Sequence, residues 1–221
     1  MSQAPRPAPP PARVVLPGRY ARLEPVIPAH AEDLFAAASV PDAAQRFTWL
    51  FSHPPETIEV TRAWIASAQG PDTIPFAVVD LATGKAGGWQ QLMRIEPQHG
   101  VVEIGNVYWG PAIARTRVAT EALYLLARYV FDELGYRRFE WKCNNENAPS
   151  KAAALRFGFT FEGVFRQHMI IKGRSRDTAW FAILDGDWPA LRAEFERWLD
   201  PANFDADGNQ RSRLAHLTPG H

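Results

Sequence analysis

The spacing of apolar residues changes midway through residues 101–143, and this change predicts three consecutive elements. Residues 101–109, VVEIGNVYW, have the β-branched and aromatic content of a strand, which Gly110-Pro111 ends because proline cannot donate to a strand ladder. From Val118 onward the apolar residues recur about every 3.6 positions, as on one face of a helix. Residues 137–143 supply a second strand, which a right-handed crossover places parallel to the first.

The predicted helix carries its own boundary signals. Thr116 is a suitable N-cap, and Gly135 stands where a left-handed C-terminal cap is favoured. Two adjoining apolar rows form the predicted buried face: Val118, Ala122, Leu126, Val130 and Leu134, and Ala119, Leu123, Ala127 and Phe131. The solvent-facing side is predicted to carry Glu121, Arg128, Asp132 and Glu133.

The remaining pattern predicts one mixed α/β domain over residues 14–200. Before the central unit we expect a strand over 14–26, helices over 28–38 and 56–69, and strands over 74–79 and 88–95 that form an antiparallel meander with 101–109. After it we expect a helix from Asn147 to Phe157, strands over 159–171 and 178–184, and a last helix capped by Asp187. Residues 1–13, rich in proline, are predicted to be a disordered arm, and residues 201–221 a flexible tail.

Charge and cysteine content narrow the class of protein. The 24 acidic side chains balance the 24 of Lys and Arg, so no overall field directs the chain to nucleic acid or an anionic membrane. No run of about 18 apolar residues and no signal-peptide pattern is found, which favours a cytoplasmic protein. One cysteine excludes an internal disulfide, and no histidine pair has zinc-ligand spacing, so no metal is expected.

The start of the central helix carries the first functional signal. Its unpaired N–H groups and positive dipole end favour an anion. Side-chain donors are added there by Arg115, Thr116, Arg117 and Thr120. A phosphate site and a solvated helix start with two surface arginines explain this local pattern equally well.

Several phrases of the sequence together resemble one large enzyme family. RTRVATEA, LGYRRFEWKCNNEN and ALRFGFTFEGVFRQHMIIKGRSRDTAWF lie within residues 19–190. They resemble the GNAT superfamily of acyl-CoA N-acyltransferases, and within it the ribosomal-protein N-terminal (Rim-type) acetyltransferase branch. The resemblance implies a GNAT fold, acetyl-CoA as co-substrate without a metal, and direct transfer of an acetyl group to a primary amine. That amine belongs either to a small molecule or to a protein N-terminus.

The family's pyrophosphate motif falls on residues 114–119. The resemblance assigns this part of the co-substrate site to Arg115, Thr116, Arg117, Val118, Ala119 and Thr120. The motif departs at Ala114, where Gln or Arg is usual, and at Arg117, where Gly is usual, so a guanidinium would replace part of a backbone cradle. The resemblance also implies that the pantetheine arm pairs with the backbone of Val107, Tyr108 and Trp109, on a strand that splays from its parallel neighbour. It further implies that Asn147 positions the pantetheine arm.

Glu103 is the leading candidate for the general base, because the matching strand of the family carries or faces the acceptor amine. An α-amino group has a reference pKa of about 7.7 to 8.0, so a carboxylate acting through water would deprotonate it. A surface carboxylate at a strand edge is the competing interpretation. Strict alternation places Glu103, Gly105, Val107 and Trp109 on one face, and Asn106 and Tyr108 on the other. The weaker candidates are Glu96, Glu140 and Glu162.

The acid that protonates the departing thiolate is the second catalytic expectation. The family often uses a tyrosine whose place is taken here by Ala154, and the resemblance implies Ser150 as its replacement. Helix capping alone also explains Asn147 and Ser150. A nucleophilic pair of Cys143 with His168 is discounted, since direct transfer needs no covalent intermediate.

Two further segments are candidates for contact with the acceptor. The alternating aromatic residues of 41–55, namely Phe47, Trp49 and Phe51, form either an acceptor-site wall or a plugged core edge, and the core edge is slightly favoured. Near the last hairpin the basic residues are Arg166, Lys172, Arg174 and Arg176. They either recognise an acidic acceptor or belong to a solvated turn, and the turn is favoured.

The sequence leaves more than one function open. An N-acetyltransferase is favoured over a catalytically weak acyl-CoA-binding or regulatory module, which the departures at Ala114, Arg117 and Ala154 would suit. A third hypothesis is an interaction protein whose proline-rich arm is a ligand for an aromatic groove. Both a monomer and a homodimer remain open.

Overall fold

One eight-stranded sheet runs through the molecule in the order β1-β2-β3-β4-β5-β6-β8-β7. The structure is a computed structural model that describes residues 7–68, 70 and 72–215. Neighbouring strands pair antiparallel except β5 and β6, which are parallel, as the crossover predicted. The strands are β1 (Leu16–Pro17), β2 (Ala21–Pro25), β3 (Thr73–Asp80), β4 (Lys85–Glu96), β5 (Val101–Trp109), β6 (Arg138–Asn144), β7 (Thr160–Ile171) and β8 (Arg174–Leu184).

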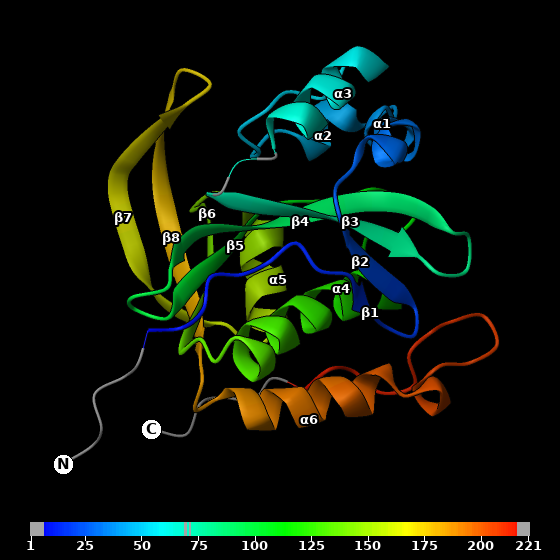
Figure 1. The fold of residues 1–221 in the computed structure, drawn as a ribbon, viewed down its shortest axis with the longest axis vertical. Helices are drawn as coiled ribbons and strands as arrows, with labels where there is room; N and C mark the ends of the chain where they lie inside the picture. The colour runs from blue at the N-terminus through cyan, green and yellow to red at the C-terminus, as the bar shows by residue number, and fades with distance from the viewer. Residues whose placement is uncertain (1–6, 69, 71, 216–221) are drawn as a thin grey trace.

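Helices cover both faces of this sheet (Figure 1). One group lies over the β3–β4 end of one face, and α4 with α6 lies across the other. The helices are η1 (Pro28–His30), α1 (Ala31–Ala38), α2 (Ala43–Arg46), α3 (Ile58–Ser67), α4 (Arg117–Arg128), η2 (Tyr129–Glu133), α5 (Ala148–Arg156), α6 (Trp188–Leu199) and η3 (Pro201–Asn203). The sheet therefore separates two cores, a large one under α4, α5 and α6 and a smaller one under α1 and α3.

The elements follow the predicted pattern closely, with one early exception. The strand expected over residues 14–26 is split into β1 and β2 by a turn at Gly18 and Arg19. The turn is held by Glu121 of α4, whose carboxylate accepts N–H groups from Arg19 at 2.9 Å, Tyr20 at 2.5 Å and Ala21 at 2.6 Å.

The expectation that Glu121 faces solvent was therefore wrong. Only 4% of this residue is exposed. Helix α4 is buried around most of its circumference, because α6 packs on the side away from the sheet. A buried carboxylate is tolerated there because it satisfies three backbone donors that would otherwise lack partners.

A β-bulge in β5 corrects the predicted alternation of side chains. Trp89 pairs with Tyr108, and Gln91 pairs with Gly105, so three steps along β5 oppose two along β4. Asn106 sits in the bulge with a positive φ of 45°. The extra residue reverses the faces beyond it. Tyr108 therefore packs in the smaller core on the Glu103 side, whereas Val107 and Trp109 pack against the larger core.

The N-terminal arm differs from the solvated segment that its prolines suggested. Residues 7–13 lie against the domain: Ala8 N–H donates to the Pro97 carbonyl at 2.9 Å, and Ala12 N–H to the Tyr129 hydroxyl at 2.8 Å. The Arg13 guanidinium donates to the Ala68 carbonyl at 3.1 Å. Proline removes backbone donors, so few remain to be satisfied along this extended stretch. Residues 1–6 lie outside the described part of the chain.

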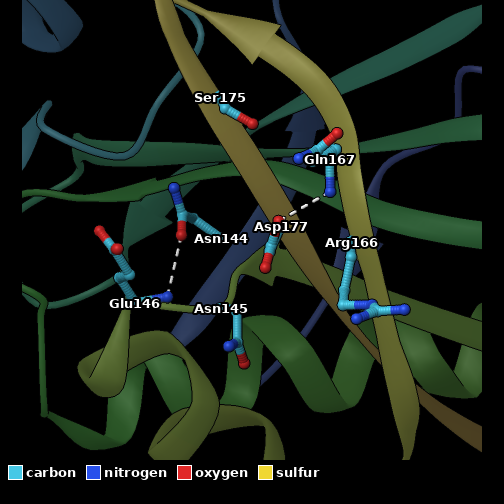
Figure 2. Close-up of a pocket in the computed structure, with 7 residues that line it drawn as sticks. All are labelled: Asn144, Asn145, Glu146, Arg166, Gln167, Ser175 and Asp177. Atoms are coloured by element: carbon cyan, nitrogen blue, oxygen red, sulfur yellow. Dashed lines mark hydrogen bonds between the residues drawn. The ribbon is translucent and has the colours of Figure 1, made fainter.

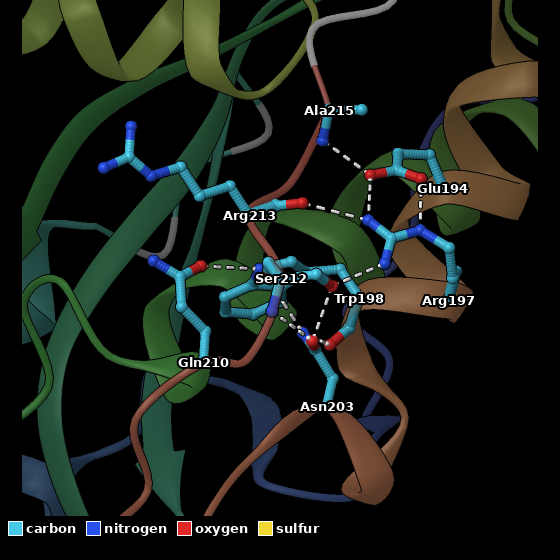
Figure 3. Close-up of polar contacts among 8 residues, drawn as sticks. All are labelled: Glu194, Arg197, Trp198, Asn203, Gln210, Ser212, Arg213 and Ala215. Carbon is cyan, nitrogen blue, oxygen red and sulfur yellow. Dashed lines mark hydrogen bonds and ion pairs between the residues drawn. The ribbon is translucent and has the colours of Figure 1, made fainter.

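The C-terminal segment also packs more closely than its polar composition suggested (Figure 3). Phe204 and Leu214 are buried, which anchors the segment at two points. Between them, Gln210 accepts the Trp198 indole N–H at 2.8 Å. Arg197 donates to the Ser212 hydroxyl at 2.7 Å while pairing with Glu194. The segment to residue 215 is thus part of the α6 layer, and residues 216–221 lie outside the described residues.

Candidate functional site

The start of α4 has the features expected of an anion-binding turn. Thr116 is the N-cap, as predicted, and its Oγ1 accepts the Val118 N–H at 3.2 Å. Arg115 precedes it with a φ of 63°, a left-handed conformation that glycine adopts without strain. The turn therefore has a glycine-like shape without the glycine. Val118, Ala119 and Thr120 form the buried first turn of the helix.

Arg117 is held by two aromatic rings. Its guanidinium carbon lies 4.4 Å from the centre of the Tyr20 ring and 5.3 Å from that of Phe204. A guanidinium stacked through its face still presents N–H donors along its edge. Its predicted contact with a phosphate stays a prediction, and the C-terminal segment, through Phe204, supports the position of this side chain.

Arg156, which the sequence analysis missed, is the second cation beside this helix start. It ends α5, and its Nη1 donates to Thr120 Oγ1 at 3.1 Å. It is half-buried, its guanidinium carbon lies 5.1 Å from the ring centres of Phe157 and Trp198, and burial lowers its pKa. Within the described chain no carboxylate forms an ion pair with it. A signal was available: no acidic residue lies within four positions of Arg156 in the sequence.

The parallel strands β5 and β6 separate beside these groups. Their pairing runs from Val101 with Arg138 to Ile104 with Trp141, and no further pair is formed along the described strands. Val107, Tyr108 and Trp109 lie beyond this point, so the edge of β5 that faces β6 is free of strand pairing there. This is the splay that the resemblance implied.

Asn147 and Ser150 lie at the start of α5, next to the splay. Asn147 Oδ1 caps the helix by accepting the Ser150 N–H at 3.1 Å, so the capping role is real. The Ser150 hydroxyl accepts the Trp141 indole N–H at 3.0 Å. That bond uses an oxygen lone pair, so Ser150 keeps its hydroxyl proton, and a side-chain hydrogen bond also links Ser150 to the Cys143 thiol. Trp141 thus orients Ser150, a role that sequence reasoning did not identify.

Cys143 is a buried thiol and not a nucleophile in this arrangement. It is 6% exposed, and burial raises its pKa, which disfavours the reactive thiolate. His168 makes its contact elsewhere: its Nδ1 lies 3.0 Å from the hydroxyl oxygen of Thr178. The discounted Cys143–His168 pair therefore has no support.

On the other face of the sheet, Glu103 is buried in a network of charges. Its exposure is 3%, and β5 is an interior strand, so the interpretation of a surface carboxylate at a strand edge was wrong. Arg94 Nη1 lies 2.6 Å and Lys142 Nζ 3.0 Å from the same oxygen, Oε2. Among the described residues no hydrogen bond is directed at Oε1. Both cations therefore bind Oε2, and Oε1 is the less engaged of the two carboxylate oxygens.

The other carboxylates near this face are engaged or distant. Glu140 lies between Lys142 at 2.6 Å and Arg138 at 2.7 Å. Glu162 binds Arg138 through both of its oxygens, and this hydrogen bonding lowers the pKa of Glu162. Glu96 is exposed at the end of β4. The geometry thus favours Glu103 over the three weaker candidates.

An open cleft of about 860 Å³ lies beside the end of β6 (Figure 2). Its lining residues come from the end of β6 and the β7–β8 hairpin: Asn144, Asn145, Glu146, Arg166, Gln167, Ser175 and Asp177. The Gln167 N–H donates to Asp177 Oδ1 at 2.7 Å, and the Glu146 N–H to Asn144 Oδ1 at 2.9 Å. The first bond links β7 to β8, and the second orders the segment that follows β6, so both polar walls of the cleft are held in place.

A smaller cavity of about 120 Å³ adjoins the cleft, since Asn144 and Ser175 line both. The rest of its lining is Thr48, Trp49, Ile171, Lys172, Arg174 and Arg176. The aromatic segment 41–55 therefore reaches the hairpin, where Lys172 Nζ donates to the Phe47 carbonyl at 2.8 Å. Phe47 is a buried core residue, as favoured, whereas Trp49 lines the cavity, and its part in an acceptor-site wall stays a prediction.

The described residues form neither a metal-ligand cluster nor a membrane-spanning helix. In residues 7–68, 70 and 72–215, no group of three or more His, Cys, Asp or Glu side chains is arranged to hold a metal ion. In the same residues, no helix has the length and apolar character needed to cross a membrane.

Comparison with known proteins places this geometry in a family. A curated relative, an uncharacterized N-acetyltransferase called p20 from Bacillus licheniformis, is 29% identical over 117 residues, which cover 51% of this chain and 63% of that protein. The match thus spans under two thirds of the relative's length. A solved GCN5-related N-acetyltransferase from Brucella melitensis is 56% identical, with a TM-score of 0.93 and coverage of 95% of this chain and 96% of that one.

A more distant structure shows the fold alone. RimL, a ribosomal L7/L12 α-N-protein acetyltransferase, is 21% identical with a TM-score of 0.68, over 77% of this chain and 94% of that one.

The family model of the acetyltransferase (GNAT) domain matches residues 21–160, which is more than half of the chain. The chain therefore belongs to the GNAT acetyltransferase family.

Proposed function

We propose that this protein transfers an acetyl group from acetyl-CoA directly to a primary amine, with both substrates bound at once. The observation that carries the proposal is the separation of β5 from β6 after Ile104 and Trp141. It lies between the helix start of α4 on one face of the sheet and Glu103 with the small Arg176 cavity on the other. A passage at that point would let an acyl carrier reach an amine across the sheet.

The residues of the α4 face suit the phosphate groups of acetyl-CoA. The proposed contacts are Arg115, Thr116, Arg117, Val118, Ala119 and Thr120, with the addition of Arg156. A half-buried guanidinium without a carboxylate partner is costly unless an anion compensates it, which supports a phosphate at this place. The pantetheine arm would pair with the free edge of β5 at Val107, Tyr108 and Trp109, close to Asn147. Acetyl-CoA supplies the activated acetyl group, and no metal is needed for this chemistry.

Two side chains carry the proton transfers in this proposal. Glu103 accepts the proton of the attacking amine at Oε1, directly or through a water, while Arg94 and Lys142 hold Oε2 in place. Ser150, oriented by Trp141, donates its hydroxyl proton toward the departing sulfur. Both groups are positioned by bonds that exist before substrate arrives, so little reorganisation accompanies the reaction.

The test is release of free thiol from acetyl-CoA in the presence of a panel of amines. Glu103→Gln should lower the rate at saturating acetyl-CoA by about 100-fold or more, the usual contribution of a general base. Glu96→Gln, an exposed carboxylate on the neighbouring strand, is the matched control and should keep full activity. Full activity in Glu103→Gln would remove that residue from the mechanism.

A binding module without turnover is the second candidate, favoured by the departures at Ala114, Arg117 and Ala154. It would bind acetyl-CoA tightly in calorimetry yet release no thiol with any amine tested.

The acceptor in the Rim-type branch would be a ribosomal-protein N-terminus. The amine panel includes N-terminal peptides of ribosomal proteins. If none of these peptides is acetylated, a ribosomal-protein N-terminus is not the acceptor.

A further inference from the structure

Arg176 is a buried cation on the Glu103 face of the sheet. It lies on β8, where Ala179 and Phe181 point into the larger core, so Thr178 and Arg176 point to the opposite face. Arg176 is 6% exposed and lines the small cavity beside the cleft. Its Nε donates to Thr178 Oγ1 at 3.1 Å, and its guanidinium carbon lies 5.5 Å from the centre of the Phe51 ring.

The surroundings of Arg176 do not compensate its charge. No carboxylate in the described residues lies within ion-pair distance of it, whereas Arg94 binds Glu103 and Arg138 binds both Glu140 and Glu162. Burial lowers the pKa of Arg176, against smaller opposing effects of Cys143 and Glu103. A buried, unpaired guanidinium with most of its five donors unused is costly, and such sites commonly wait for an anion.

The cavity around it has one sign of charge. Three cationic residues line it, namely Lys172, Arg174 and Arg176, and no acidic residue does. Its volume of about 120 Å³ is roughly that of four waters, which suits a carboxylate and few further atoms. The larger cleft that adjoins it leaves room for the rest of an acceptor.

We propose that Arg176 is the specificity-determining residue of the acceptor site, and that the acceptor carries a carboxylate close to the amine that is acetylated. This inference rests on the proposed function, because it places the amine at Glu103. Two sources supply the same chemistry: the α-carboxylate of a free amino acid, and the acidic side chain at the first position of a peptide. An Arg guanidinium binds either one through paired N–H donors.

The test compares acceptors that differ in one carboxylate. Free amino acids are paired with their C-terminal amides, and peptides beginning with Asp or Glu are paired with peptides beginning with Asn or Gln. With the native protein, one of the two pairs should show a carboxylate preference of about 10-fold or more, mainly in KM, as expected of a charge-assisted hydrogen bond. The pair that shows it identifies the source. Equal use of both members of each pair would overturn the proposal.

Variants assign the preference to Arg176. Arg176→Gln should abolish it, Arg176→Lys should retain part of it, and the exposed Arg137→Gln should leave it unchanged. Arg176→Gln should also keep or raise the melting temperature, because it removes an uncompensated buried charge. A carboxylate preference that persists in Arg176→Gln would refute the assignment. If that variant does not fold, Arg176→Lys is judged alone, and an unchanged preference in it would refute the assignment equally.

A binding measurement separates this inference from the proposed function. If no amine is acetylated, N-acetyl amino acids and their amides are titrated by calorimetry in the presence of coenzyme A. Tighter binding of the carboxylate form, lost in Arg176→Gln, supports the anion site even though transfer has failed. Equal binding of the two forms overturns the site.

Discussion

Replacing Arg156 by Gln tests whether this residue binds the co-substrate or stabilises the fold. In the native protein its Nη1 donates to Thr120, but Thr120 Oγ1 also donates to the Thr116 carbonyl at 3.3 Å, so this hydroxyl keeps a partner in the variant. The lost bond is offset by removal of a half-buried charge that has no ion-pair partner within the described chain. We therefore expect the free energy of unfolding to change by less than about 1 kcal/mol.

The effect on acetyl-CoA binding should be much larger. A hydrogen bond from a guanidinium to a charged group contributes about 1.5 to 3 kcal/mol, which corresponds to about 10- to 150-fold in Kd. Calorimetric titration of acetyl-CoA measures this directly, and thermal unfolding without ligand measures the stability. Arg128→Gln is the matched control, since Arg128 also lies over an aromatic ring, Tyr124, but at the other end of α4.

Two results would contradict this role of Arg156. If Arg156→Gln binds acetyl-CoA as tightly as Arg128→Gln does, no phosphate lies against Arg156. If its melting temperature falls by more than about 8 °C, which for a chain of this size exceeds about 2 kcal/mol, the guanidinium stabilises the fold and its unpaired state needs another explanation.

Three other side chains can be tested in the same way. Glu121→Gln places an amide group opposite backbone donors and should lower the unfolding free energy by about 2 to 5 kcal/mol in denaturant titration. The exposed Glu133→Gln is the control and should change the unfolding free energy by less than about 0.5 kcal/mol. Equal effects of the two substitutions would show that the three hydrogen bonds to Glu121 do not stabilise the fold. Arg115→Gly relieves a left-handed residue and should raise stability by up to about 1 kcal/mol, so a loss of that size would contradict the conformation. Cys143 should react with a maleimide far more slowly in the native protein than in denaturant at pH 7, because the thiol is buried and its pKa is raised; equal rates would contradict its burial.

Most of the fold could be predicted from local patterns, and the misses have physical causes. Alternation and helical periodicity located nearly every element, the parallel pair β5–β6 and the Thr116 cap. The bulge at Asn106 was missed because it depends on how β4 and β5 pair, although Gly105 beside it, inside a strand pattern, is a signal of a bulge. The burial of Glu121 depends on α6 and on the β1–β2 turn, which lies 100 residues away in the sequence.

The site was predictable to a smaller extent. Resemblance supplied Glu103 and Ser150, but the partners that define them come from other elements: Lys142 on β6 for Glu103, and Trp141 for Ser150. Arg176 looked like part of a solvated turn because its neighbours in sequence are polar. Its burial arises from the β7–β8 hairpin and the segment that contains Phe51. Contacts between distant segments therefore decided which charged residues are functional candidates.

A mass-spectrometric screen follows the acetyl group to its acceptor. The protein is incubated with isotopically labelled acetyl-CoA and a cell extract from which small amines and proteins are both recovered. With the native protein, at least one primary amine should gain the labelled acetyl group, and this product should be nearly absent with Glu103→Gln. If the native protein binds acetyl-CoA and yet no amine gains the label, the claim that it is an acetyltransferase is contradicted.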